Sequence, residues 1–174
     1  MSELGVTAIN LQRKVPVNTS RLIRHAQLAL TAVKKTNFDL SLVIVNDQRM
    51  RSLNRSYRGK SGTTDVLSFD AEIPLPGGVR NTFLGEIIIS APQAMRQAKQ
   101  QKIDFDDEMT NLAIHGVCHL LGYDHELGEE ESRKMKAKEQ NIAAMIRRSD
   151  KTLLAPEDIA GKITSQPGQR KRKS

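Results

Sequence analysis

The chain has 174 residues, a formal net charge of +7 at pH 7 and one cysteine, and this length suits a single domain with its own hydrophobic core. It contains no run of about 18 apolar residues and no secretory signal at its start, which excludes a transmembrane helix and predicts no membrane contact. Because Cys118 cannot form an internal disulfide, we expect a cytoplasmic protein in which this thiol only packs a helix.

The first part of the chain alternates between strand and helix patterns. We predict a strand over Val6–Val15, a helix from an N-cap at Ser20 to about Lys35, a buried strand over Leu40–Val45 and a short helix capped by Asn46 or Asp47. His25 lies on the first helix, far in the sequence from the other three histidines. We interpret it as an ordinary surface or boundary residue.

The segment Asn54–Gly62 is rich in positive charge and is predicted to interrupt regular structure. Its glycines would let backbone N–H groups approach an anion, and arginine offers a planar pair of donors, so the segment could bind phosphate. Composition alone favours a solvated basic loop. The candidate phosphate contacts are Arg55, Arg58 and Lys60.

Two further strands and a helix are predicted before the histidine cluster. We predict strands over Asp65–Phe69 and Phe83–Ile89, a Pro/Gly loop over Ile73–Asn81 between them, and a helix from Ser90 to about Gln100. Glu86 is a polar residue among the apolar residues of the second strand. Asp65 is either a turn residue or a hydrogen-bond partner of the functional site.

Three of the four histidines fall within eleven residues, His115–His125. Acidic residues open a helix at about Asp104, and the apolar run that follows places His115 and His119 on one helical face. Gly122 ends the helix and lets the chain return His125 towards the other two. Three protein nitrogens leave one position of a tetrahedral ion open, which is typical of a catalytic zinc site, although nickel and copper bind the same ligands.

The spacing HxxxHxxGxxH is similar to the metzincin signature HExxHxxGxxH, in which the glutamate acts as the general base. In this chain Gly116 occupies that position and cannot transfer a proton. A peptidase is therefore disfavoured. Asp124, the nearest carboxylate in the sequence, is interpreted as fixing the loop before His125 or orienting a ligand.

The C-terminal part is predicted to be an amphipathic helix over Glu129–Arg148 followed by a tail. From Lys151 to Ser174 six basic residues face two acidic ones, so this tail carries +4 of the net charge and the rest of the chain +3. The tail has few apolar residues and is predicted to be disordered. We expect one domain over residues 1–150 and a basic, disordered tail over residues 151–174.

Three segments carry motifs of a known family: HGVCHLLGYDH (His115–His125), NRSYRGKSGTTDVLSF (Asn54–Phe69) and FLGEIIIS (Phe83–Ser90). Together they resemble the YbeY family of bacterial rRNA maturation factors over about Asn10 to Ile146. Two positions depart from the family pattern. Asp70 stands where the family usually has proline, and Glu86 replaces the commoner aspartate.

The resemblance implies a single-strand-specific, metal-dependent endoribonuclease that acts in rRNA processing, including small-subunit rRNA 3′ end maturation, and in ribosome quality control. Its expected partners are single-stranded RNA, rRNA, the small ribosomal subunit and assembly factors, and its expected cofactor is one Zn²⁺ ion. A noncatalytic, metal-stabilised ribosome-assembly factor and a zincin-like metallohydrolase or peptidase remain as alternatives.

The expected fold is a single α+β domain: a mixed sheet of about four strands, packed with about five helices, and a zincin-like three-histidine metal site on a central helix. The metal ligands are His115, His119 and His125, and the catalytic residues are His115 and Arg58. The candidate substrate contacts are Arg55, Lys60 and Glu86. By analogy with zincin-like folds, the strand over Phe83–Ile89 is expected to form a sheet edge that flanks the RNA.

Overall fold

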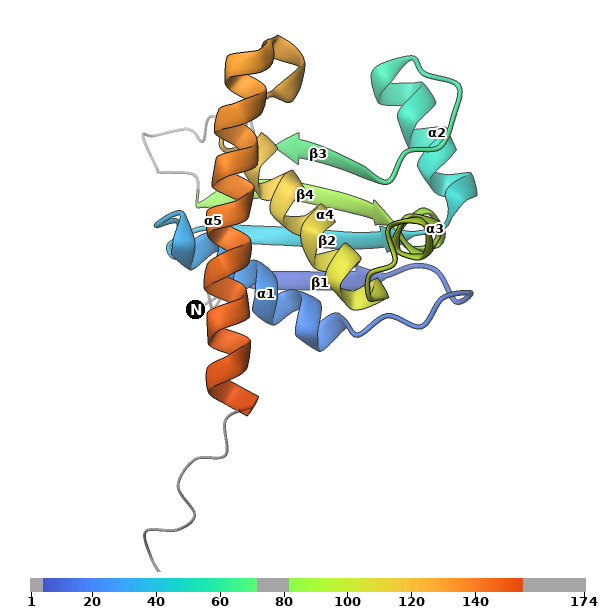
Figure 1. Ribbon diagram of the computed structural model, residues 1–174. Coiled ribbons are helices and arrows are strands. Elements are labelled where there is room, and N and C mark those ends of the chain that lie inside the picture. Colours follow the sequence, from blue (N-terminus) through green and yellow to red (C-terminus); the bar gives the residue numbers. More distant parts are fainter. Residues whose placement is uncertain (1–4, 72–81, 155–174) are drawn as a thin grey trace, which may run out of the picture.

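The computed structural model describes residues 5–71 and 82–154, which form four strands and five α-helices (Figure 1). The strands are β1 (Val6–Asn10), β2 (Asp39–Val45), β3 (Val66–Asp70) and β4 (Phe83–Ser90). The helices are α1 (Thr19–Ala32), α2 (Asp47–Arg58), α3 (Ala91–Gln101), α4 (Phe105–Leu120) and α5 (Glu129–Leu154), with the 3-10 helix η2 (His125–Leu127) before α5. This confirms the predicted α+β fold. None of these helices combines the length and apolar character needed to cross a bilayer.

The sheet has the strand order β1-β2-β4-β3 and is mixed, as predicted. β1, β2 and β4 run parallel, and β3 runs antiparallel to β4 with Ser68 opposite Ile87. The prediction that Phe83–Ile89 forms the sheet edge is wrong, because β3 returns along the outer side of β4 and β4 is therefore paired on both sides. Within the described residues, β3 is the edge strand on this side of the sheet.

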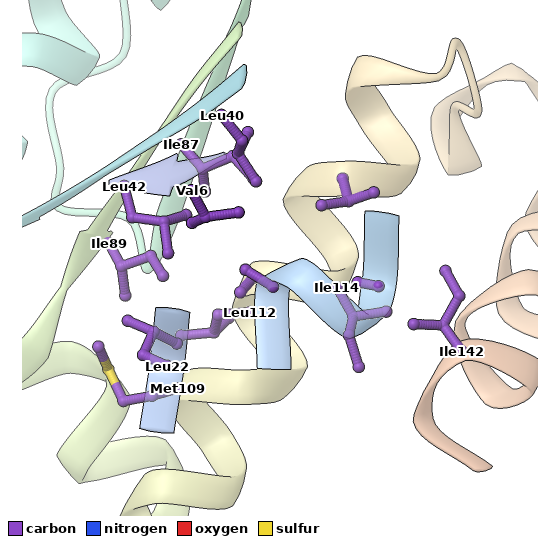
Figure 2. Close-up of a cluster of buried hydrophobic side chains, with 14 of the residues drawn as sticks. Val6, Leu22, Leu40, Leu42, Ile87, Ile89, Met109, Leu112, Ile114 and Ile142 are labelled. Atoms are coloured by element: carbon purple, nitrogen blue, oxygen red, sulfur yellow. The ribbon is translucent and has the colours of Figure 1, made fainter. Parts of the chain in front are cut away.

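The main core lies between one face of the sheet and helices α1 and α4. Figure 2 shows side chains from both layers meeting there, among them Leu40, Leu42, Ile87, Ile89, Leu22, Met109 and Leu112. Successive strand residues point to opposite faces, so Ile88 belongs instead to a smaller cluster with Met50 of α2. Each such buried side chain stabilises the fold by about 1.5–3 kcal/mol. Packing along its length therefore fixes α4 against the sheet.

The segment between β1 and α1 is irregular, and two predicted boundaries there are wrong. β1 ends at Asn10 rather than Val15, because the buried Gln12 side chain donates to the Val15 carbonyl at 2.8 Å and accepts from the Val15 N–H at 3.0 Å. These bonds close a loop where a longer strand was expected. Helix α1 begins after Asn18, whose side chain accepts from the Arg21 N–H, and not after Ser20.

Helix α2 extends into the basic segment that was predicted to interrupt regular structure. It is capped by Asn46, one of the two residues predicted for that position, and continues to Arg58. Gly59 ends it in the left-handed conformation with φ 63°, and the Gly59 N–H donates to the Arg55 carbonyl at 3.2 Å. The buried residue Asn54 donates to the Gly62 carbonyl at 2.9 Å, and this bond holds the segment after the helix against it.

Helix α5 continues past its predicted end at Arg148, and past the expected domain boundary at residue 150, to Leu154. Near its end it contacts α1 through Asp150, which pairs with Arg24. Residues 155–174 of the predicted disordered tail lie outside the described residues. The predicted loop over Ile73–Asn81 also lies outside them.

His25 is a buried structural residue, and its interpretation as a surface or boundary histidine is wrong. Its exposed fraction is 2%. Its Nδ1 lies 2.7 Å from Thr110 Oγ1 on α4, and its Nε2 lies 3.1 Å from Asp150 Oδ2 on α5. Helical periodicity placed it beside the apolar face of α1, but only the docking of α4 and α5 supplies its polar partners.

We expect His25→Gln to destabilise the protein most above pH 6.5 and progressively less as the pH falls. Burial lowers the pKa of His25 from 6.5 despite the opposing charge of Asp150, so the folded wild type binds a proton less readily than the unfolded chain. The His25 contribution is therefore present above pH 6.5 and lost on acidification. Urea unfolding should give a difference of about 1–3 kcal/mol at pH 7.5.

The Arg24–Asp150 pair is present in both proteins, so comparing them at each pH removes the contribution of that pair and leaves the effect of His25 together with its contact to Asp150. The loss of Asp150 stability on acidification has the same sign, because Arg24 and His25 outweigh burial and lower its pKa. A difference that grows as the pH falls would instead indicate a charged His25 paired with Asp150.

Candidate metal centre

Two of the three clustered histidines lie on the last turns of α4. The N-cap of the helix is Asp104, whose side chain accepts from the Asp106 N–H at 2.9 Å, and its first turn is acidic as predicted. Both features stabilise the positive end of the helix dipole. His115 and His119 are one turn apart, so their side chains leave the helix on the same face.

The turn after α4 brings in the third histidine. Gly122 has φ 89°, and its N–H donates to the His119 carbonyl at 2.9 Å, which confirms the predicted glycine stop. Asp124 then accepts from the Glu126 N–H at 2.8 Å and caps η2. This bond is the loop-fixing role expected of Asp124, and it sets His125 at the start of η2.

The three imidazole rings converge. The Nε2 atoms of His115 and His119 are 3.1 Å apart, and one nitrogen from each of the three histidines lies within 4.8 Å of the others. Tetrahedral zinc with Zn–N bonds of about 2.0–2.1 Å would place two ligand nitrogens roughly 3.3 Å apart. The donor set and the separation between His115 and His119 therefore fit such an ion, and His115, His119 and His125 could hold it.

Glu139 of α5 supports the cluster, and the sequence analysis missed it. The Nδ1–H of His115 donates to Glu139 Oε1 at 2.6 Å, which leaves the other ring nitrogen for an ion. Glu139 is half-buried and falls between the buried residues Met135 and Ile142 at helical spacing. A carboxylate on the apolar face of the predicted helix was the available signal.

The protonation states of α4 side chains suit metal binding by nitrogen. Burial, followed by the neighbouring rings of His115 and His125, lowers the pKa of His119, so this ring is neutral near pH 7. Neutral imidazole is the form that a metal ion requires. Burial raises the pKa of the Cys118 thiol to about 12, consistent with the packing role expected of it.

A cavity of about 680 Å³ opens beside the histidines. The end of α2, the edge strand β3 and the three histidines line it. Arg58 reaches it from α2 and Glu126 from η2, and Arg58 Nη2 lies 3.7 Å from Glu126 Oε1. Tertiary structure thus brings Arg58, predicted to be catalytic, to the same cavity as the predicted metal ligands.

The other predicted substrate residues do not line this cavity. Arg55 and Lys60 are exposed at the end of α2 and just after it. Glu86 is half-buried in the central strand β4, where its Oε2 accepts from Ser41 Oγ at 3.3 Å. Because it alternates with Ile87, Glu86 faces away from α4. Asp65, left open between two roles, accepts from the Val66 N–H at 2.8 Å as a turn residue does and also lines the cavity.

Gly116 has a structural reason to lack a side chain. It is buried where α4 crosses β4, and a Cβ built on it would lie 2.7 Å from Cγ2 and 2.8 Å from Cδ1 of Ile87. A side chain at this position would point at the sheet and not at the histidines. The position that carries the metzincin glutamate is therefore a close helix–strand contact in this protein.

A helix packed across a mixed sheet, with two histidines on its last turns and a third on the following turn, defines a class of α+β protein whose three-histidine site could hold a metal ion. The family model described as Endoribonuclease YbeY matches residues 7–147 of this chain. The chain therefore belongs to the YbeY family, as the sequence motifs indicated.

Individual relatives agree with this assignment. An Endoribonuclease YbeY of Thermodesulfovibrio yellowstonii is 39% identical over 158 residues, covering 83% of this chain and 98% of that relative. One from Pelotomaculum thermopropionicum is 44% identical over 149 residues, covering 82% and 97%. The solution structure of TM1509 from Thermotoga maritima has a TM-score of 0.57 at 24% identity, covering 90% of this chain and 99% of that one, so the two share a fold.

Proposed function

We propose that this protein is a single-strand-specific, metal-dependent endoribonuclease. The observation that carries the proposal is the convergence of His115, His119 and His125 in a cavity that Arg58 also lines. Relatives named Endoribonuclease YbeY support the reaction class. A metal site beside a guanidinium suits phosphodiester cleavage, because both stabilise negative charge on the non-bridging oxygens.

Zinc is the ion that we propose for this site. Imidazole is a common zinc ligand, and three protein nitrogens leave one position of the tetrahedron open. The same donors bind nickel and copper, so metal analysis should include both. A bound divalent ion would supply Lewis acidity and water activation near neutral pH, even though the glutamate of the metzincin motif is replaced by Gly116.

The chain's own residues would bind and orient the phosphodiester. Arg58 can donate two hydrogen bonds to a phosphate. Its pair with the exposed Glu126 is worth only about 0.2–1 kcal/mol, so a phosphate could displace that carboxylate. Glu139 holds the His115 ring in position through Nδ1. Either water or the ribose 2′-OH can attack at such a site, and a 2′,3′-cyclic phosphate product would identify the second route.

In the cell, we propose that this activity serves rRNA processing in the cytoplasm, including small-subunit rRNA 3′ end maturation and ribosome quality control. Its partners would be the small ribosomal subunit and assembly factors. The net charge of +7 supports an RNA partner, because basic proteins gain affinity by releasing counterions from phosphates. Arg55 and Lys60, exposed at the end of α2, could add contacts of this sequence-independent kind.

The proposal is tested by incubating the purified protein with an end-labelled single-stranded RNA and with the same RNA in a duplex. The single strand should be cut, a chelator should stop the reaction, and added Zn²⁺ should restore it. RNA binding without cleavage under any divalent ion would instead favour the noncatalytic assembly factor. Cleavage of peptides alone would favour the metallohydrolase.

We expect Arg58→Ala to lower kcat/KM for RNA cleavage by about 10²–10³-fold, as removing one donor to a transition-state oxyanion does. Arg58→Lys should recover only part of this, because lysine lacks the paired donors. Arg55→Ala is the matched control, since it removes the same charge three residues earlier on α2 but outside the cavity. Equal losses in the Arg55 and Arg58 variants would reduce Arg58 to a general electrostatic contact.

A further inference from the structure

Tyr57 is the most exposed aromatic residue of this chain and stands at the cavity of the candidate metal centre. Its exposed fraction is 66%, whereas the next most exposed aromatic residue, Phe83, reaches 39%. Tyr57 lies on the last turn of α2, directly before Arg58, and both line the cavity with the three histidines. Exposing an aromatic ring to water is unfavourable, and aromatic residues exposed at a site commonly mark a binding surface.

The Tyr57 ring is held in place while a face remains available. It contacts Phe69 of the edge strand β3 with 4.9 Å between ring centroids and an interplanar angle of 65°. This is an edge contact and not a parallel stack. Phe69 is half-buried and packs against the small core cluster under α2. The pair therefore braces Tyr57 from one side and leaves the rest of the ring towards solvent.

The chemistry around Tyr57 indicates the kind of ligand. Arg58 supplies a planar cationic donor to the cavity that Tyr57 lines, and the histidine cluster lies in the same cavity. A ligand that matches both features has a flat π-system attached to an anionic backbone, as a nucleotide does. The cavity of about 680 Å³ is within the range of about 300–1,000 Å³ typical of small-molecule sites, so it has room for one nucleotide unit.

We infer that Tyr57, braced by Phe69, is the stacking platform for one unpaired nucleobase of an RNA whose adjoining phosphate is bound by Arg58. This inference rests on the proposed function and identifies the side chain that distinguishes unpaired RNA from a duplex. A base inside a duplex is stacked on both faces and cannot lie on Tyr57. Because every base has a π-face, the contact selects unpaired RNA with little preference for sequence.

The test measures RNA binding under conditions that prevent cleavage. Full-length protein is kept in chelator and titrated with a short single-stranded RNA that carries the fluorescent base 2-aminopurine at successive positions. At one position, wild type should quench the fluorescence by stacking. Tyr57→Phe should bind within about twofold of wild type, and Tyr57→Leu, which keeps an apolar contact with Phe69, should bind about 5- to 100-fold more weakly.

Two controls separate stacking from a structural effect. Ile9→Ala removes another exposed apolar side chain, on β1 and outside the cavity, and should leave binding unchanged. An RNA with an abasic site at the quenched position should bind wild type as weakly as Tyr57→Leu binds the intact RNA. The two changes should not add, because each removes the same contact.

Equal binding and quenching by wild type and Tyr57→Leu, or additive losses with the abasic RNA, would overturn the inference, and so would absence of quenching in wild type. The outcome is independent of the proposed reaction. If the stacking is found but metal-loaded protein cuts no RNA, the endonuclease proposal fails and Tyr57 remains a nucleobase-binding residue.

Discussion

His119→Ala is expected to abolish metal binding and RNA cleavage together. The remaining histidines, His115 and His125, leave two positions of a tetrahedral ion to solvent, so the ion should be lost on purification. A catalytic metal contributes several kcal/mol of transition-state stabilisation, so its loss should lower the rate by about 10³–10⁴-fold or more. The measurements are metal content by mass spectrometry and initial rates on single-stranded RNA.

Gln140→Ala provides the control, because Gln140 is an exposed polar residue on α5, next to Glu139 but outside the cavity of the metal centre. It should retain both metal and activity. Residual cleavage by purified His119→Ala would reveal a contaminating nuclease or a reaction that does not need the cluster. Wild-type metal content in that variant would contradict the proposed ligand set directly.

Glu139→Gln should reduce metal binding less than His119→Ala does, because Glu139 orients a metal ligand and is not itself one. The amide can still accept the His115 Nδ1–H but lacks the charge that increases the basicity of the ring. We expect metal affinity to fall by about 10–100-fold, with activity restored by excess Zn²⁺. Failure of excess metal to restore cleavage would show that Glu139 has a further role in the reaction.

Gly116→Glu, which completes the metzincin motif, is expected to disrupt folding and to create no peptidase. The new side chain would run into Ile87 on β4 and bury a carboxylate against the sheet. Overpacking and an unpaired buried charge together should destabilise the protein by more than about 4 kcal/mol. Thermal melts and a peptidase assay check both parts, and a stable variant with a wild-type Tm would contradict the packing account.

A double-mutant cycle tests the same contact with smaller changes. Gly116→Ala should destabilise the protein, since overpacking of about 1–3 kcal/mol exceeds the gain in helix propensity of up to about 1 kcal/mol. Ile87→Ala alone should cost about 2–5 kcal/mol. Ile87→Ala removes the three Ile87 atoms that crowd position 116. The double variant should therefore be destabilised by about 0.5–3 kcal/mol less than the sum of the two single effects. If the destabilisation of the double variant equals the sum of the two single effects, Ile87 moves aside for the new Cβ without strain.

The sequence alone predicted those features that depend on neighbouring residues. The four-residue spacing of His115 and His119, the glycine stop at Gly122 and the helix starts near Asn46, Ser90 and Asp104 all depend on bonds within a few positions. Strands β2 and β4 were predicted from their apolar runs. Predicted element boundaries were wrong where a side chain forms a hydrogen bond that the local pattern does not indicate, as when Gln12 closes a loop after β1.

Tertiary structure decided the features that depend on how distant elements pack. Glu139 meets His115 across 24 positions, and His25 is buried only because α4 and α5 supply Thr110 and Asp150. Among the described strands, β3 and not β4 forms the sheet edge next to the cavity because of the order in which the strands pair. Periodicity and capping determine what each element is and which face is apolar. They leave open the partner that each face meets, because register and docking are set by the fit of whole layers.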